Sequence, residues 1–122
     1  MSKDRYVRRA HTVTELKYHF VLKTKYSYGV LKGEMALRAR DIIREICTEN
    51  GMQILKGHVG TNHIHLMVSA PAHLSVAKIA QYLKGKSSYR LQREFPALRK
   101  QYWGVGARIF LCHSRGSDRA AD

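Results

Sequence analysis

The feature that most limits how this chain can fold is the order in which its apolar residues change spacing. Residues 14–23 alternate between apolar and polar side chains, which is typical of a half-buried strand. Residues 34–50 instead repeat apolar side chains at steps of three and four, as one face of a helix does. Asn50 and Gly51 can end that helix, since both tolerate a left-handed backbone.

The second half of the chain repeats this order with one extra strand. Residues 52–59 and 63–69 favour two strands joined by a short turn, and residues 76–95 carry the apolar stripe of a second helix. Residues 108–112 are short and apolar, which favours a fourth strand. The order strand, helix, strand, strand, helix, strand predicts an α+β, ferredoxin-like βαββαβ fold. In that fold, both main helices cover one face of an antiparallel sheet.

The second helix has clear expected ends and one weak point. Ser75 can cap its start and Pro96 can terminate it. Gly85 lies inside the pattern and costs about 1 kcal/mol of helix propensity there. We therefore expect either a break or close packing at Gly85.

The length and composition fit one domain. The chain has 122 residues, of which 44% are hydrophobic, and we expect a single domain with a basic leader (1–10) and a polar tail (113–122). No apolar run approaches the roughly 20 residues of a membrane span, and the charged N-terminus does not look like a signal peptide. Cys47 and Cys112 form no CxxC pair, so we expect a reduced, cytoplasmic setting without structural zinc.

The charge is strongly basic and unevenly distributed. The formal net charge is +13, from 22 Lys and Arg against 9 Asp and Glu. Residues 32–50 are balanced, whereas the basic residues of 51–117 face a single acid, Glu94. This division favours a polyanionic partner, of which nucleic acid is the commonest. A merely basic surface is the alternative.

Two histidines stand two residues apart in the third expected strand. Alternation should place His63 and His65 on one face with Met67, while Ile64 and its apolar neighbours pack under the helices. Side chains at i and i+2 stand about 7 Å apart on a strand face, so two neutral imidazoles can converge on one divalent ion. The alternative is a pair of half-exposed histidines without any role.

Two further histidines could approach this pair. His19 lies on the polar face of the first strand. By alternation, His58 should share a face with Met52, Ile54 and Lys56 on the second. Either could reach the pair if its strand is adjacent to the third.

The second helix carries a basic and aromatic ridge. Its residues follow helical spacing, with two flanking cations: Lys78, Tyr82, Lys86, Tyr89, Arg90 and Arg93. Lysines and arginines can neutralise phosphates, and tyrosines can stack on unpaired bases at roughly 1–3 kcal/mol each. We expect this ridge to bind DNA; an ordinary solvated helix face is the alternative.

Several longer stretches carry a family resemblance. They are HIHL within IREICTENGMQILKGHVGTNHIHLMVSAP, the segment YLKGKSSYRLQREFPALRKQYW, and the opening LKYHFVLKTKYSYGVL. In this order, over nearly the whole chain, they resemble the small single-tyrosine HUH transposases of bacterial insertion sequences (IS200 group, TnpA type). Asn62 stands where many members carry Asp, which is a mild departure.

The resemblance implies a chemistry. It implies that His63 and His65 hold Mg²⁺ or Mn²⁺, which polarises a scissile phosphate in single-stranded DNA. It also implies attack by a tyrosine, which leaves a 5′-phosphotyrosine and a free 3′-OH. The family recognises DNA hairpins and works as a homodimer that exchanges the tyrosine-bearing helix.

The family's tyrosine and glutamine beyond the last strand find no match here. No tyrosine follows Tyr102 and no glutamine follows Gln101. We therefore leave the nucleophile unknown and expect an impaired copy that has lost its end. Tyr82, Tyr89 and Tyr102 match other family positions, and for each we expect packing or DNA contact.

Two other functions stay open at this stage. One is a non-catalytic hairpin-binding relic or repressor on the same fold. The other is an RNA-binding domain that shares the strand order, but HIHLMVS on the third strand lacks the aromatic signature of that class.

Overall fold

The structure, a computed structural model, describes residues 15–98 and 109–116. Several expectations lie outside these ranges: the basic leader (1–10), Gln101, Tyr102, Arg108 and residues 117–122 of the tail. The elements are β1 (Glu15–Thr24), the short 3-10 helix η2 (Lys25–Ser27), α1 (Gly33–Glu49), β2 (Gln53–Val59), β3 (His63–Pro71), α2 (Val76–Glu94) and β4 (Phe110–Gly116).

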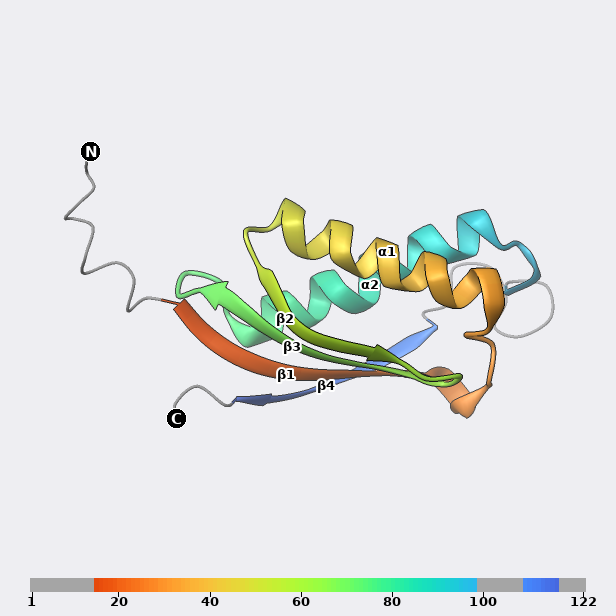
Figure 1. The fold of residues 1–122 in the computed structure, drawn as a ribbon, viewed down its shortest axis with the longest axis horizontal. Coiled ribbons are helices and arrows are strands. Elements are labelled where there is room, and N and C mark those ends of the chain that lie inside the picture. Colours follow the sequence, from red (N-terminus) through yellow and green to blue (C-terminus); the bar gives the residue numbers. More distant parts are fainter. Residues whose placement is uncertain (1–14, 99–108, 117–122) are drawn as a thin grey trace.

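The ferredoxin-like architecture is confirmed. The four strands form one antiparallel sheet in the order β2-β3-β1-β4. Both α1 and α2 lie on the same side of this sheet, as Figure 1 shows. One face of the sheet is therefore covered by helices, and we call the other the open face. The two central strands, β1 and β3, carry most of the pairing.

The core forms where the alternating strands meet the helices. Phe20 and Leu22 of β1 are fully buried, as are Ile64 and Val68 of β3 to within 1%. Burying a side chain of this size contributes roughly 1.5–3 kcal/mol. Alternation places their neighbours on the open face, so the same two strands serve the core and the solvent side.

A register shift in β2 changes which side chains share a face. Ile54 pairs with Val68 on the helical face, but the next pair is Lys56 with Met67, so Leu55 is an extra residue in the strand. Beyond this bulge, His58 pairs with His65. The prediction that His58 shares a face with Met52 and Ile54 is therefore wrong, because a bulge inserts one residue and reverses the alternation.

The helices end close to their expected positions. Ser75 caps α2, since its Oγ accepts a hydrogen bond from the Lys78 N–H at 3.0 Å. The helix runs unbroken through Gly85, and a Cβ added there would meet no atom within 4 Å outside the local helix backbone. Neither the expected break nor the close packing at Gly85 occurs.

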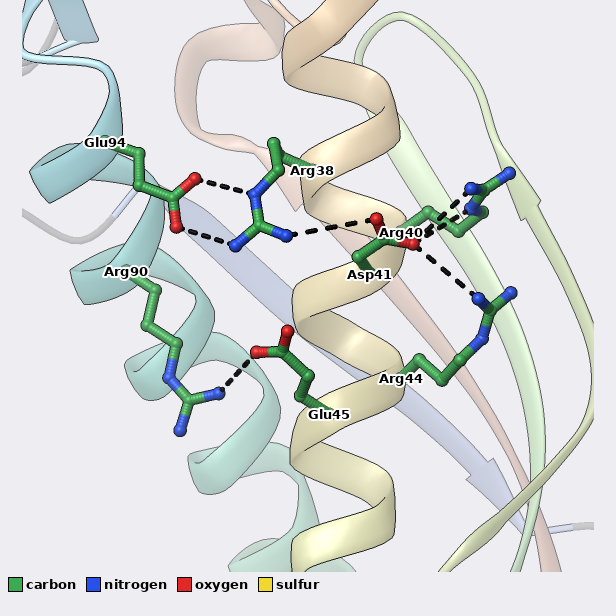
Figure 2. Close-up of polar contacts among 7 residues, drawn as sticks. All are labelled: Arg38, Arg40, Asp41, Arg44, Glu45, Arg90 and Glu94. Atoms are coloured by element: carbon green, nitrogen blue, oxygen red, sulfur yellow. Dashed lines mark hydrogen bonds and ion pairs between the residues drawn. The ribbon is translucent and has the colours of Figure 1, made fainter.

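Ion pairs join the outer surfaces of the two helices. Arg38 of α1 contacts Glu94 of α2 through two hydrogen bonds of 2.7 Å, as Figure 2 shows. The hydrogen bond from Arg38 holds the pKa of the Glu94 carboxyl below its usual value. Asp41 lies near Arg38, Arg40 and Arg44 on α1 itself. The charged side chains of residues 32–50 therefore largely form ion pairs within the helical layer.

Strand β4 is longer than the apolar pattern suggests. It runs from Phe110 to Gly116, so it includes four residues of the expected polar tail. Each pairs with β1, from His113 opposite Val21 to Gly116 opposite Tyr18. Backbone hydrogen bonds to a central strand hold this edge segment irrespective of its side chains. In the described residues, no helix is long and apolar enough to cross a membrane.

Candidate functional site on the open face

The two histidines of β3 project from the open face, as alternation predicts. Ile64 and Leu66 are buried beneath the helices at 1% and 5% exposure. His63 is half-buried and His65 is exposed. The pair therefore stands on the side of the sheet that α1 and α2 leave uncovered.

The turn before β3 fixes the ring of His63. Its Nδ1 lies 3.1 Å from Oδ1 of Asn62. Because that oxygen can only accept, we assign the proton to Nδ1, which leaves Nε2 as the lone-pair nitrogen. Gly60 makes room for the ring, since a Cβ at this position would lie 2.6 Å from the imidazole Cε1. Histidines that bind metals typically donate their other ring N–H to a neighbouring oxygen in this way.

Two further histidines flank the pair on the neighbouring strands. His58 of β2 is paired with His65, and its ring centroid lies 6.0 Å from that of His63. His19 of β1 is paired with Met67, and its ring lies 6.1 Å from that of His65. Both rings approach the pair, as the sequence allowed, but the bulge that brings His58 to this face had no signal in the periodic pattern.

The donor set fits a divalent ion only in part. Two neutral imidazoles can supply two nitrogen ligands, and Mg²⁺ or Mn²⁺ can complete its shell with water and phosphate oxygens. Among residues 15–98 and 109–116, no three His, Cys, Asp or Glu side chains lie close enough to hold an ion together. His63 and His65 are therefore the candidate imidazole ligands on this face, and His58 is paired with His65 on the neighbouring strand.

A shallow hollow adjoins the histidines. It has a volume of about 350 Å³, and its lining includes His19, Lys56, His58, His65 and Met67. Lys56 brings a cation to the edge of this hollow. An anionic group such as a phosphate would find both a positive charge and imidazole donors there.

The ridge on α2 forms on the far side of the molecule. Cations lie over its tyrosine rings. Lys86 Nζ lies 4.9 Å and Lys78 Nζ lies 5.8 Å from the centre of the Tyr82 ring. The Arg93 guanidinium lies 5.5 Å from the Tyr89 ring and donates a hydrogen bond to its hydroxyl. These contacts align aromatic faces with positive charge, as the spacing suggested.

Arg90 differs from the other ridge residues. Its guanidinium contacts Glu45 at 3.3 Å and Glu49 at 3.0 Å across the interface between α1 and α2 (Figure 2 draws the Glu45 contact). A DNA phosphate would have to compete with these carboxylates. The sequence could not foresee this, because the partners lie more than forty residues away on another helix.

Comparison with known proteins agrees with this architecture. Residues 12–113 match the family model described as "Transposase IS200 like". The chain is 35% identical over 92 residues to the ISDra2 transposase TnpA of Deinococcus radiodurans, covering 75% of this chain and 66% of that protein. It is 36% identical over 93 residues to the transposase for insertion sequence element IS200 of Salmonella typhimurium, covering 76% and 61%.

Solved structures give the same picture. A putative transposase from Deinococcus radiodurans superposes with a TM-score of 0.75 at 30% identity, covering 83% of this chain and 78% of that one. A REP-associated tyrosine transposase bound to a REP hairpin superposes with a TM-score of 0.60 at 10% identity, covering 83% and 55%. The second likeness concerns the fold alone. The matched region spans 66% and 61% of the two sequence relatives.

Proposed function

Because this chain belongs to the IS200-like transposase family, we propose that it acts in metal-dependent cleavage and rejoining of single-stranded DNA at hairpin-marked ends. The observation that carries the proposal is the histidine pair on the open face, with His63 oriented by Asn62. A tyrosine transposase that shares the fold is bound to a REP hairpin, which supports the choice of substrate. We propose a homodimer as the working form, as the resemblance implies, and a cytoplasmic location, as the cysteine pattern suggests.

The metal belongs to His63 and His65 in this proposal. When bound, Mg²⁺ or Mn²⁺ would act as a Lewis acid that polarises a phosphate and orients it. The Asn62 side chain contacts Nδ1 of His63, which leaves Nε2 as the nitrogen whose lone pair could bind the metal. Lys56 at the edge of the adjoining hollow would attract the strand to this face.

The identity of the nucleophile stays open. Tyr82 and Tyr89 lie on α2, which covers the opposite face of the sheet from the histidines (Figure 1). That placement argues against either hydroxyl reaching a phosphate at His63 and His65 of the same chain. Tyr102 is outside the described residues, and no tyrosine follows it in the 122 residues.

We therefore propose that these 122 residues bind hairpin DNA but cleave it poorly by themselves. The open face of β1, β2 and β3 carries two imidazoles that could bind the metal but no tyrosine, which favours binding with poor cleavage. The alternative function is a hairpin-binding relic or repressor that never cleaves. Both share the DNA-binding ridge of Lys78, Tyr82, Lys86, Tyr89 and Arg93, with Arg90 available only if it leaves Glu45 and Glu49.

A binding and nicking experiment tests the proposal. A fluorescent single strand with a hairpin is titrated with the protein, and samples with Mn²⁺ are run on a denaturing gel to detect covalent protein–DNA product. We expect salt-sensitive binding and little or no covalent product. Robust covalent product would overturn the claim of impairment, and equal binding to an unstructured strand would overturn hairpin recognition.

A matched pair of variants tests the ridge. Lys86→Ala should weaken binding to all sequences and reduce the salt slope by about one phosphate contact. Arg44→Ala serves as the control, because Arg44 is also a cationic residue at the surface of a helix but lies on α1 beside Asp41. If both variants weaken binding alike, a general basic surface explains the affinity and the ridge does not.

A further inference from the structure

An exposed aromatic pair follows the first strand. Tyr26 is 71% exposed and Tyr28 is 37% exposed. Their ring centroids lie 5.8 Å apart with planes tilted by 58°, and Lys25 Nζ lies 6.0 Å from the Tyr26 ring. Neither the family's histidine motif nor the ridge on α2 accounts for this pair.

The backbone at the pair adopts a disfavoured conformation. Tyr26 has φ 64° and ψ 16°, and Ser27 has φ 58°, so two successive residues with a Cβ lie in the left-handed region. Glycine or asparagine usually occupies such positions. Strained backbone of this kind concentrates at binding sites, where the surrounding structure imposes it.

The surrounding structure does hold this loop in place. The Thr24 N–H donates to the Asn62 carbonyl at 2.9 Å, and Thr24 Oγ1 donates to the Tyr28 carbonyl at 2.7 Å. Beyond the tyrosines, the Leu31 N–H donates to the Thr61 carbonyl at 2.9 Å. The loop is therefore tied at both ends to the turn between β2 and β3.

That turn also orients the histidine site. Asn62 accepts from Thr24 through its backbone and contacts His63 Nδ1 through its side chain. Lys23, the residue before Thr24, is paired with His63 across the strands. Figure 1 shows η2 at the end of the sheet where this turn lies.

We propose that Tyr26 and Tyr28 form a stacking platform for an unpaired nucleobase of the single strand whose phosphate lies at His63 and His65. The inference rests on the proposed function and adds a contact to it. A nucleobase is a suitable ligand because its flat face can stack on an exposed tyrosine ring. Such stacking accepts every base. Residues 16–33 contain four lysines and no acid, which suits the phosphates that flank such a base.

The test uses the 122-residue protein and a hairpin oligonucleotide with a single-stranded extension. One base of the extension at a time is replaced by 2-aminopurine, whose fluorescence falls when an aromatic ring stacks on it. We expect quenching at one or two adjacent positions only. Uniform quenching along the extension, or none at any position, would overturn the platform.

Tyr26→Asn removes the ring while keeping a residue that accepts the left-handed backbone, so the fold should persist. We expect this variant to lose the local quenching and roughly fivefold or more of its affinity for the extended hairpin. Tyr26→Phe should retain both, because the ring remains. Leu37→Ala is the control, since it removes an exposed apolar side chain on α1 (54% exposed) and should change neither.

A hairpin without the extension separates the two proposals. If it binds the wild type and Tyr26→Asn equally, while only the extended hairpin distinguishes them, the platform is supported. If the variant binds the extended hairpin as the wild type does, the platform is wrong and hairpin recognition stands. If the wild type binds neither DNA, the proposed function fails first.

Discussion

The two faces of one sheet divide the work of this molecule. On the helical face, Phe20, Leu22 and Val68 are completely buried. On the open face of the same strands, His65 is exposed, and His19 and His63 are half-buried. Neighbouring residues in the sequence therefore serve opposite purposes: one anchors the core and the next is available for ligands.

Because of this division, folding stability and ligand binding should be separately alterable by mutation. A side chain on the open face contacts few core atoms, so its removal should leave folding nearly intact. A side chain on the helical face contacts the packed layer, so its removal should lower the stability of the fold. The side chains on the open face should stay unchanged. Four measurements test how complete this separation is.

The largest effect should come from Phe20→Ala. Deleting a fully buried ring costs about 3–5 kcal/mol through lost transfer energy and the cavity left behind. The adjacent Val21→Ala on the open face should cost about 1 kcal/mol or less. Urea denaturation followed by circular dichroism measures both, and similar losses for the two variants would contradict the division.

The reactivity of the two cysteine thiols tests the same separation of the two faces. Burial raises the pKa of the Cys47 thiol to about 11 and that of Cys112 also to about 11. Cys112 is paired with Leu22, so it faces the helical layer. Below pH 9 the thiolate fraction of each should be about a hundredfold lower than for an ordinary thiol, because a pKa of about 11 replaces the usual 9.0. Disulfide-exchange labelling at pH 8 should be slow until urea is added; rapid labelling of the folded protein would show an open core.

Metal affinity should depend on the open face alone. His65→Ala should weaken Mn²⁺ binding by roughly tenfold or more, since it removes one of the two imidazole ligands that we propose. Its unfolding free energy and most of its DNA affinity should persist, because we propose that the phosphate contacts lie mainly on α2. Calorimetric titration measures the metal, with His73→Ala as a control for an exposed histidine outside the sheet. Collapse of DNA binding in a folded His65→Ala variant would refute this assignment.

The smallest effect should come from the ion pair between Arg38 and Glu94 on the surface of the helical layer. Arg38 lowers the pKa of the Glu94 carboxyl, so this pair adds stability above the ordinary value of 4.5 and loses it as the pH falls through the folded value. The two side chains are 34% and 39% exposed, so solvent screens the contribution. Glu94→Gln should lower the urea midpoint at pH 7 by no more than about 0.3 M. The difference from wild type should vanish at acidic pH; a constant difference would assign the effect to packing.

Local patterns sufficed for much of this architecture. In β1 and β3, every second residue is apolar over several positions, so the buried side could be inferred from Leu22 or Ile64 without any tertiary information. The helices carried capping and stopping residues such as Ser75. The placement of His63 and His65 followed directly from these strands.

Other features depend on contacts between distant segments. The bulge at Leu55 arises from pairing with β3, so the face of His58 could not be read from β2 alone. The last residues of β4 are polar and are held by backbone pairing with β1, which leaves no periodic signal. The ion pairs of Arg90 with Glu45 and Glu49 likewise join two helices distant in the sequence.

The absence of a side chain at Gly60 has a practical consequence for engineering. Its backbone is not in the left-handed region, so Gly60→Ala is a substitution that a thermostability screen would try in order to stiffen a hairpin. The added methyl group would occupy the space of the His63 ring and push it away from Asn62. Optimising this turn for heat resistance would therefore select, unnoticed, for a protein that keeps its fold and loses the cation binding that we propose.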